Sequence, residues 1–145
     1  MTRNTIHRIL LVFAALLNTS AVVHAAEPSK GEKLFALKVK LLFAEKCIAC
    51  HGDDPDDIAG GFDMRSREAL LKGGESFEAD VVIPGKGEQS FLYVATTRSE
   101  EGYEMPPKEA ERLTQEQQWW IHDWINEGAP WPDETRVTEI QSKYA

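Results

Sequence analysis

The feature that most constrains this chain is a short segment that holds both of its cysteines, Cys47-Ile48-Ala49-Cys50-His51. Side chains three positions apart on a helix share a face, so the two thiols can act on one bound group. With only two cysteines in 145 residues, a multi-disulfide scaffold is excluded. The fold therefore has to present two thiols and an imidazole together, beside an apolar core.

The spacing Cys-x-x-Cys-His is the attachment sequence of c-type haem. The two thiols can reach the two vinyl groups of one porphyrin, and the following imidazole is carried under the ring, where a nitrogen can bind iron. The segment also closes an amphipathic stretch, which offers an apolar surface to the macrocycle. The sequence predicts one haem c bound covalently to Cys47 and Cys50, with His51 as the proximal iron ligand.

Three other uses of the two cysteines stay open. A thioredoxin-type motif normally follows a strand and opens a helix, whereas this motif closes a helix. A disulfide between Cys47 and Cys50 is compatible with an oxidising compartment but does not require His51. A zinc site would need a fourth ligand and would leave the export signal described below unexplained.

Met105 is the preferred distal iron ligand. It stands in Glu104-Met105-Pro106-Pro107, which is extended because each proline disfavours helical backbone at the residue before it. A thioether is a soft ligand, and His/Met ligation raises the reduction potential relative to His/His. The alternatives are Met64, which can instead fill a gap in the core, His122 on the last predicted helix, and water or an open position.

The apolar pattern predicts an all-α domain over residues 29–132. The first helix, residues 29–46, has Ser29 and Glu32 as a capping box and an apolar stripe at helical spacing. Shorter helices are expected at 66–71 and 90–97. A last helix starts at Thr114, where Gln117 completes a second capping box, and ends at Gly128. Residues 133–145 are polar and are predicted to be a flexible C-terminal tail.

Residues 1–25 have the pattern of a signal peptide. Arg3 and Arg8 precede an unbroken apolar run, 9–17, and small residues precede Ala26. Nine apolar residues rise about 14 Å as a helix, which is short of the roughly 30 Å hydrocarbon core of a membrane. We expect cleavage before Ala26, a periplasmic protein and no stable membrane span.

The acidic balance excludes a nucleic-acid partner. Lys and Arg total 16 and Asp and Glu total 24, a formal charge of −8, whereas displacing counterions from phosphates needs a basic face. Acidic residues crowd into 53–57, directly after the motif. This segment is interpreted as a solvated loop or as a docking patch for a basic redox partner. A third alternative is a calcium loop, although the segment lacks the alternating ligands and the turn glycine of such a loop. Basic candidates to pair with haem propionates are Arg65, Arg67, Lys72, Lys86 and Arg98.

Further segments join the motif in a combined pattern. They are Leu70-Leu71-Lys72-Gly73-Gly74, Pro84-Gly85-Lys86, Met105-Pro106-Pro107 and a Trp-rich stretch at 124–132. Together with 34–52 and 60–67, they resemble the planctomycete-type cytochrome c domain, a small single-haem c-type cytochrome. The resemblance covers roughly residues 31–132. It implies a class I-like all-α fold in which N- and C-terminal helices cross beside the haem, with haem c on Cys47 and Cys50, His51 proximal and Met105 distal.

The expected function is electron transfer without enzymatic activity, with the iron cycling between Fe(III) and Fe(II) for redox partner proteins. A filled sixth position leaves no site for a substrate, and the cofactor does the chemistry. One alternative is a five-coordinate haem protein that senses a small ligand or acts as a peroxidase-like accessory domain, which requires Met105 to be off the iron. Another is a thiol–disulfide protein without haem.

Overall fold

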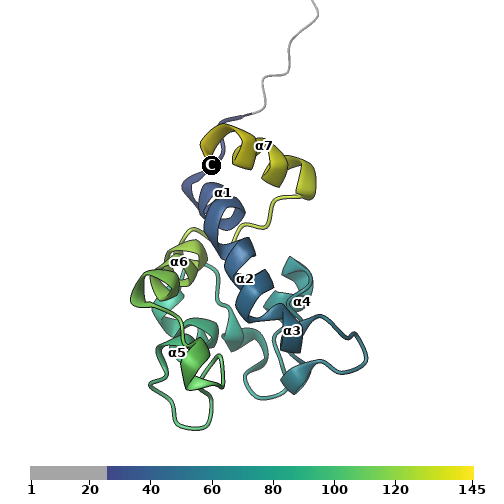
Figure 1. The fold of residues 1–145 in the computed structure, drawn as a ribbon, viewed down its shortest axis with the longest axis vertical. Helices are drawn as coiled ribbons and strands as arrows, with labels where there is room; N and C mark the ends of the chain where they lie inside the picture. Colours follow the sequence, from purple (N-terminus) through teal and green to yellow (C-terminus); the bar gives the residue numbers. More distant parts are fainter. Residues whose placement is uncertain (1–25) are drawn as a thin grey trace, which may run out of the picture.

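The structure, a computed structural model, describes residues 26–145, so the predicted signal peptide at 1–25 lies outside the described residues. Over the described range the chain is helical and contains no strand, as the sequence predicts (Figure 1). The helices are α1 (Lys30–Leu34), α2 (Lys40–Lys46), α3 (Ile48–His51), α4 (Arg67–Lys72), α5 (Phe91–Thr97), α6 (Gln115–Asn126) and α7 (Glu134–Tyr144). A π-helical segment, Phe35–Val39, joins α1 to α2, and short 3-10 turns cover Ala59–Gly61, Glu78–Val81, Gly87–Gln89 and Glu109–Glu111.

Both predicted capping boxes are present. The N–H of Glu32 donates to Ser29 Oγ at 3.1 Å, and the N–H of Ser29 donates to the Glu32 carboxylate at 2.8 Å. At the start of α6, Thr114 and Gln117 exchange the same pair of hydrogen bonds, at 2.9 and 3.2 Å. These contacts satisfy N–H groups that a helix start otherwise leaves unpaired, which is why both helices begin where the sequence predicts.

The first helical stretch and α6 pack against each other through aromatic side chains. Phe35 and Phe43 are buried on the predicted apolar stripe, and their rings lie 5.8 and 5.5 Å from that of the fully buried Trp124. Trp131, which follows α6, lies 4.6 Å from Phe35. Aromatic pairs at these separations stabilise the contact beyond the burial of apolar area alone.

Gly31 allows the close approach of α1 to the end of α6. A Cβ at this position would lie 2.7 Å from Glu127 Cβ and 2.7 Å from Pro130 Cγ, closer than carbon atoms can approach. The absence of a side chain at Gly31 therefore sets the distance between the two helices.

The π-helical segment changes the hydrogen bonding of one carbonyl. The N–H of Lys40 donates to the carbonyl of Phe35, five residues back, rather than to that of Ala36. Ala36 O instead accepts a hydrogen bond of 2.9 Å from the side-chain amide of Gln141, on α7. Ala36 is fully buried, so this contact satisfies a carbonyl that would otherwise be costly to bury.

The expectation of a flexible tail over residues 133–145 is contradicted by the structure. These residues form α7, which Asp133 caps by accepting the N–H of Arg136, and which buries Val137 and Ile140. Figure 1 shows α7 beside α1, at the end of the molecule where the described chain begins. Two buried apolar residues make too short a stripe to stand out in a polar segment, so the sequence pattern does not reveal this helix.

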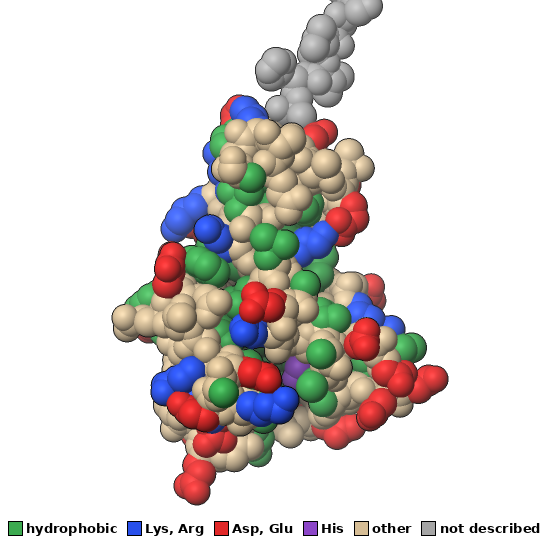
Figure 2. All heavy atoms as spheres, in the orientation of Figure 1, with side chains coloured by type: hydrophobic (Ala, Val, Ile, Leu, Met, Phe, Trp, Pro, Cys, Tyr) green, Lys and Arg blue, Asp and Glu red, His purple; other side chains and the backbone are tan. Residues whose placement is uncertain are grey.

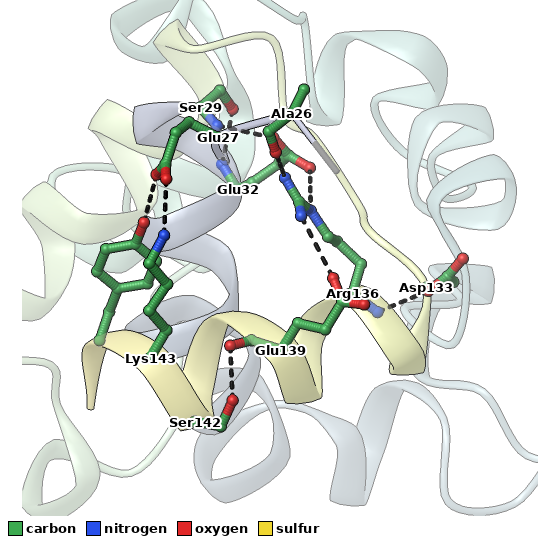
Figure 3. A network of polar contacts seen from close by, with 10 residues as sticks. Ala26, Glu27, Ser29, Glu32, Asp133, Arg136, Glu139, Ser142 and Lys143 are labelled. Carbon is green, nitrogen blue, oxygen red and sulfur yellow. Dashed lines mark hydrogen bonds and ion pairs between the residues drawn. The ribbon is translucent and has the colours of Figure 1, made fainter. Parts of the chain in front are cut away.

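Polar contacts also hold α7 to the first described residues (Figure 3). Lys143 Nζ and Tyr144 Oη both bind the carboxylate of Glu27, at 2.6 and 2.5 Å. The Arg136 guanidinium donates to Ala26 O at 2.5 Å and pairs with Glu32 at 3.4 Å. The two ends of the described chain are therefore joined by a network of charged side chains.

Candidate functional site

Cys47 lies between α2 and α3, and Cys50 and His51 belong to α3. The N–H groups of Cys50 and His51 both donate to the carbonyl of Cys47, at 3.1 and 3.0 Å. Both thiols are free; Cys47 is partly buried and Cys50 is exposed. This single turn holds the three side chains on one short helical element, as the spacing predicts.

All three side chains line one cavity of about 360 Å³. Met64 and Met105 line the same cavity, so two thiols, an imidazole and two thioethers face a common space. The larger apolar side chains of the wall come from four regions of the chain: Phe62; Phe77 and Val81; Phe91, Leu92 and Ala95; and Tyr103, Pro106, Pro107 and Leu113.

The lining of this cavity fits a haem, and its volume is that of a ligand cavity. Ligand cavities are about 300–1,000 Å³ and are mostly apolar with a few placed polar groups. Here the soft sulfur and nitrogen donors that bind iron stand in a wall suited to an apolar macrocycle. The residues that would hold the group are Cys47 and Cys50 through sulfur, and His51 and Met105 through the metal.

His51 is oriented by a backbone carbonyl. Its Nδ1 lies 3.2 Å from Phe62 O, and since a carbonyl can only accept, the proton is on Nδ1 and the lone pair is on Nε2. Burial lowers the pKa of His51, although hydrogen bonds to the carbonyls of Phe62 and Ala59 partly oppose this. A neutral imidazole with one nitrogen fixed by a backbone carbonyl is the form that binds a metal.

Cys47 lacks the acidity of a redox-active thiol. Burial, with a smaller contribution from Cys50, raises the pKa of Cys47 to about 12. Reactive Cys-x-x-Cys thiols have lowered pKa values, because the thiolate is the attacking species. The environment of Cys47 therefore disfavours the thiol–disulfide alternative.

Met105 and Met64 reach the cavity from different elements. The N–H of Met105 donates to Ala95 O, at the end of α5, at 3.0 Å. The N–H of Met64 donates to the carbonyl of His51 itself at 2.8 Å, and its side chain is buried. Met105 is thus attached to a part of the wall separate from the Cys-x-x-Cys-His turn, whereas Met64 is attached to that turn.

His122 does not line the cavity. Its ring nitrogens lie 3.0 Å from Asp123 Oδ1 and 3.2 Å from Asn126 Nδ2, and the ring packs edge-on against Trp119. The structure therefore places this alternative ligand in a polar and aromatic cluster on α6, away from the other candidates.

An aromatic cluster at the cavity is missed by the sequence patterns. The rings of Phe77 and Phe91 stack with centroids 3.5 Å apart, and Tyr103 packs edge-on against both. These residues belong to three separate segments and have no common period, so only the folded chain shows that they form one wall.

The candidate propionate partners include three arginines that are already engaged. Arg65 pairs with Asp63 at 2.7 Å, and Arg67 donates to Ala129 O and Gly128 O beyond the end of α6. Arg98 donates to Pro106 O. The guanidinium groups of these three arginines therefore already contact backbone carbonyls or a neighbouring carboxylate.

The acidic segment 53–57 forms an exposed loop directly after α3. Asp54 accepts the N–H of Asp56 at 2.9 Å, which is a local turn contact. Figure 2 shows acidic side chains gathered at the edge of the molecule beyond α3. Negative charge is thus concentrated close to the Cys-x-x-Cys-His turn.

Residues 26–145 contain neither a cluster of metal ligands nor a membrane-spanning helix. Among these residues, no three His, Cys, Asp or Glu side chains gather as a metal-binding group would. No helix in this range has the length and apolar character needed to cross a bilayer.

Comparison with known proteins gives one match. The family model described as Planctomycete cytochrome C matches residues 47–109, which include both cysteines, His51, Met64 and Met105. Neither the curated proteins nor the solved structures gave a match. The resemblance seen in the sequence is thus confirmed over residues 47–109, which match the Planctomycete cytochrome C family.

Proposed function

We propose that this protein is an exported, single-haem c-type cytochrome that carries electrons between partner proteins. The observation that supports this most strongly is the shared apolar cavity lined by Cys47, Cys50, His51 and Met105. When bound there, haem supplies reversible one-electron exchange between Fe(III) and Fe(II).

Cys47 and Cys50 would hold the group covalently. Each thiol would add across one vinyl C=C of the porphyrin, with its hydrogen going to the neighbouring carbon, so the addition would consume no oxidant or reductant. Both sulfurs lie on one turn and line the same cavity, which supports attachment of a single haem to this pair.

His51 and Met105 would be the proximal and distal ligands. The hydrogen bond from His51 Nδ1 to Phe62 O leaves Nε2 free to bind. Met105 is supported over Met64 by its attachment to α5, since a ligand from a separate element can approach from another side of the cavity. If both residues bind the iron, the chain would leave no position there for a substrate.

The cytochrome domain would include residues 29–132 in the class I-like arrangement, with α7 packed against its first helix. The packing of Phe35 and Phe43 on Trp124 supports a crossing of the first helical stretch with α6, which would be the N- and C-terminal helices of that arrangement. In this arrangement the crossed helices form the scaffold that supports the Cys-x-x-Cys-His turn at the end of α2.

Export and docking complete the proposal. Cleavage of the signal peptide before Ala26 would deliver the chain to the periplasm, where c-type attachment is made. A basic redox partner would dock near the acidic loop at 53–57, since opposite charge speeds the encounter of two proteins.

The test is expression with c-type maturation machinery, followed by mass spectrometry under denaturing conditions and an absorption spectrum. We expect one haem retained covalently and a low-spin spectrum with a weak Met–iron charge-transfer band. A high-spin spectrum would indicate the five-coordinate alternative, and a colourless protein would overturn both haem proposals. His51→Ala should prevent stable holoprotein, whereas His122→Ala serves as the matched control and should load normally.

A further inference from the structure

Arg98 lies at the end of α5 and holds the segment that carries Met105. Its Nη1 donates to Pro106 O at 2.5 Å, and its Nε pairs with Glu109 at 3.0 Å. The side chain is only 15% exposed, unlike that of Glu109, which is 64% exposed. A largely buried guanidinium on a carbonyl makes a charge-assisted hydrogen bond, which is stronger and more directional than a surface ion pair.

This contact works together with a backbone contact on the other side of Met105. The N–H of Met105 donates to Ala95 O, and the carbonyl of Pro106 accepts from Arg98. Both partners belong to the end of α5, so the backbone is tied to the same helix before and after the Met105 side chain. Ala95 and Pro106 themselves line the cavity.

We propose that Arg98 is a positioning residue that holds Met105 in place for binding to the haem iron. The proposal rests on the proposed His/Met ligation and deepens it. By fixing Pro106 O, Arg98 limits the movement of the Met105 backbone, so the thioether meets the iron with less loss of conformational freedom. Without Arg98, Met105 would leave the iron more often and an added ligand would take its place.

The chain offers a matched control in Arg112. The exposed side chain of Arg112 also pairs with the Glu109 carboxylate, at 2.7 Å. Substituting either arginine with glutamine removes one positive charge close to Glu109. Arg98 has a positive φ of 62°, and Arg98→Gln keeps a non-glycine residue there, so the backbone cost is retained.

The experiment compares ferric holoproteins of the wild type, Arg98→Gln, Arg98→Lys and Arg112→Gln. The readouts are the Met–iron charge-transfer absorbance, the midpoint potential and the affinity for added imidazole. Loss of a charge-assisted hydrogen bond corresponds to about a tenfold or larger change in an equilibrium constant. On this basis, we expect Arg98→Gln to bind imidazole about tenfold more tightly than the wild type. Its Met–iron charge-transfer band should be weaker and its midpoint potential lower.

Arg98→Lys should lie between the wild type and Arg98→Gln, because a single ammonium cannot replace the planar fork. Arg112→Gln should match the wild type. If Arg98→Gln does not give holoprotein, Glu109→Gln is measured instead. This variant keeps the guanidinium of Arg98 but removes the carboxylate that pairs with it. We expect a smaller increase in imidazole affinity than for Arg98→Gln. Wild-type imidazole affinity in folded Arg98→Gln, or in Glu109→Gln where Arg98→Gln does not fold, would overturn the proposal.

Met105→Ala separates this outcome from failure of the ligation itself. If Met105→Ala leaves the spectrum unchanged, Met105 is not the ligand and both proposals are wrong. If Met105→Ala abolishes the charge-transfer band while Arg98→Gln preserves it with unaltered imidazole binding, only the role of Arg98 is overturned.

Discussion

The side-chain amide of Gln141 donates a 2.9 Å hydrogen bond to the carbonyl of Ala36. This is the carbonyl that the π-helical segment leaves without its usual partner, since Lys40 donates to Phe35 instead. Lys40 also pairs with Glu134 at the start of α7. The π-helical segment of the first helical stretch therefore leaves a carbonyl free to accept a hydrogen bond from α7.

The first prediction removes this donor while keeping the shape of the side chain. Gln141→Glu replaces the amide N–H by a carboxylate oxygen at neutral pH, so an acceptor faces the buried carbonyl. Leaving a buried carbonyl unsatisfied costs about 1–3 kcal/mol. We expect the free energy of unfolding, measured with denaturant, to fall by about this amount. Ser142→Ala, whose hydroxyl makes only an exposed local contact, is the control and should change it by less than about 0.5 kcal/mol.

The second prediction concerns the whole of α7. A chain that ends at Pro132 loses the buried side chains of Val137 and Ile140. Each contributes about 1.5–3 kcal/mol when fully buried, so we expect a loss of roughly 3–6 kcal/mol in unfolding free energy. An unchanged thermal midpoint in the truncated chain would show that 133–145 acts as a loose tail.

The third prediction distinguishes the two methionines of the cavity. Met105→Ala should convert the haem from low to high spin and lower the midpoint potential, because the iron loses its thioether ligand. Met64→Leu keeps a side chain of similar volume and should leave the spin state unchanged, at a stability cost below about 1.5 kcal/mol. The absorption spectrum and a redox titration measure both variants. The reverse pattern, with a high-spin Met64→Leu, would make Met64 the ligand.

The fourth prediction is a pH dependence at the contact between the two ends of the chain. Hydrogen bonds from Lys143 and Tyr144 lower the pKa of Glu27 from 4.5 to about 2. A carboxyl whose pKa is lower in the folded state stabilises the fold above its unfolded pKa, and this contribution is lost as pH falls from 4.5 towards 2. The thermal midpoint of the wild type should therefore fall more steeply than that of Glu27→Gln across this window. Because Glu27 is on the surface, the difference should be small and should shrink in high salt. Parallel curves would mean that the contact is not maintained in solution.

The helical elements could be predicted because their signals are local. The capping boxes at Ser29 and Thr114 and the stripe that includes Phe35 and Phe43 each lie within one segment, and the structure confirms them. The Cys-x-x-Cys-His turn is equally local, since one helical turn is enough to bring Cys47, Cys50 and His51 together.

The remaining parts of the site depend on contacts between distant segments. Nothing near Arg98 in the sequence indicates that its guanidinium reaches Pro106 O, and its positive charge alone made it a propionate candidate. Likewise, His122 follows the apolar Ile121 in the sequence, yet its ring contacts Asp123 and Asn126 and does not line the cavity.

The sequence by itself determined the helical class, the Cys-x-x-Cys-His turn and the Met105 segment, because each depends on residues that are close along the chain. Only the tertiary structure decided that α7 packs on the first helix, since its polar partners, Ala36, Glu27 and Lys40, are about a hundred residues away. It also decided which side chains share a cavity with Cys47 and His51. Both α7, a polar helix with two buried residues, and the aromatic wall of the cavity depend on distant segments. These segments become neighbours only after the chain has folded.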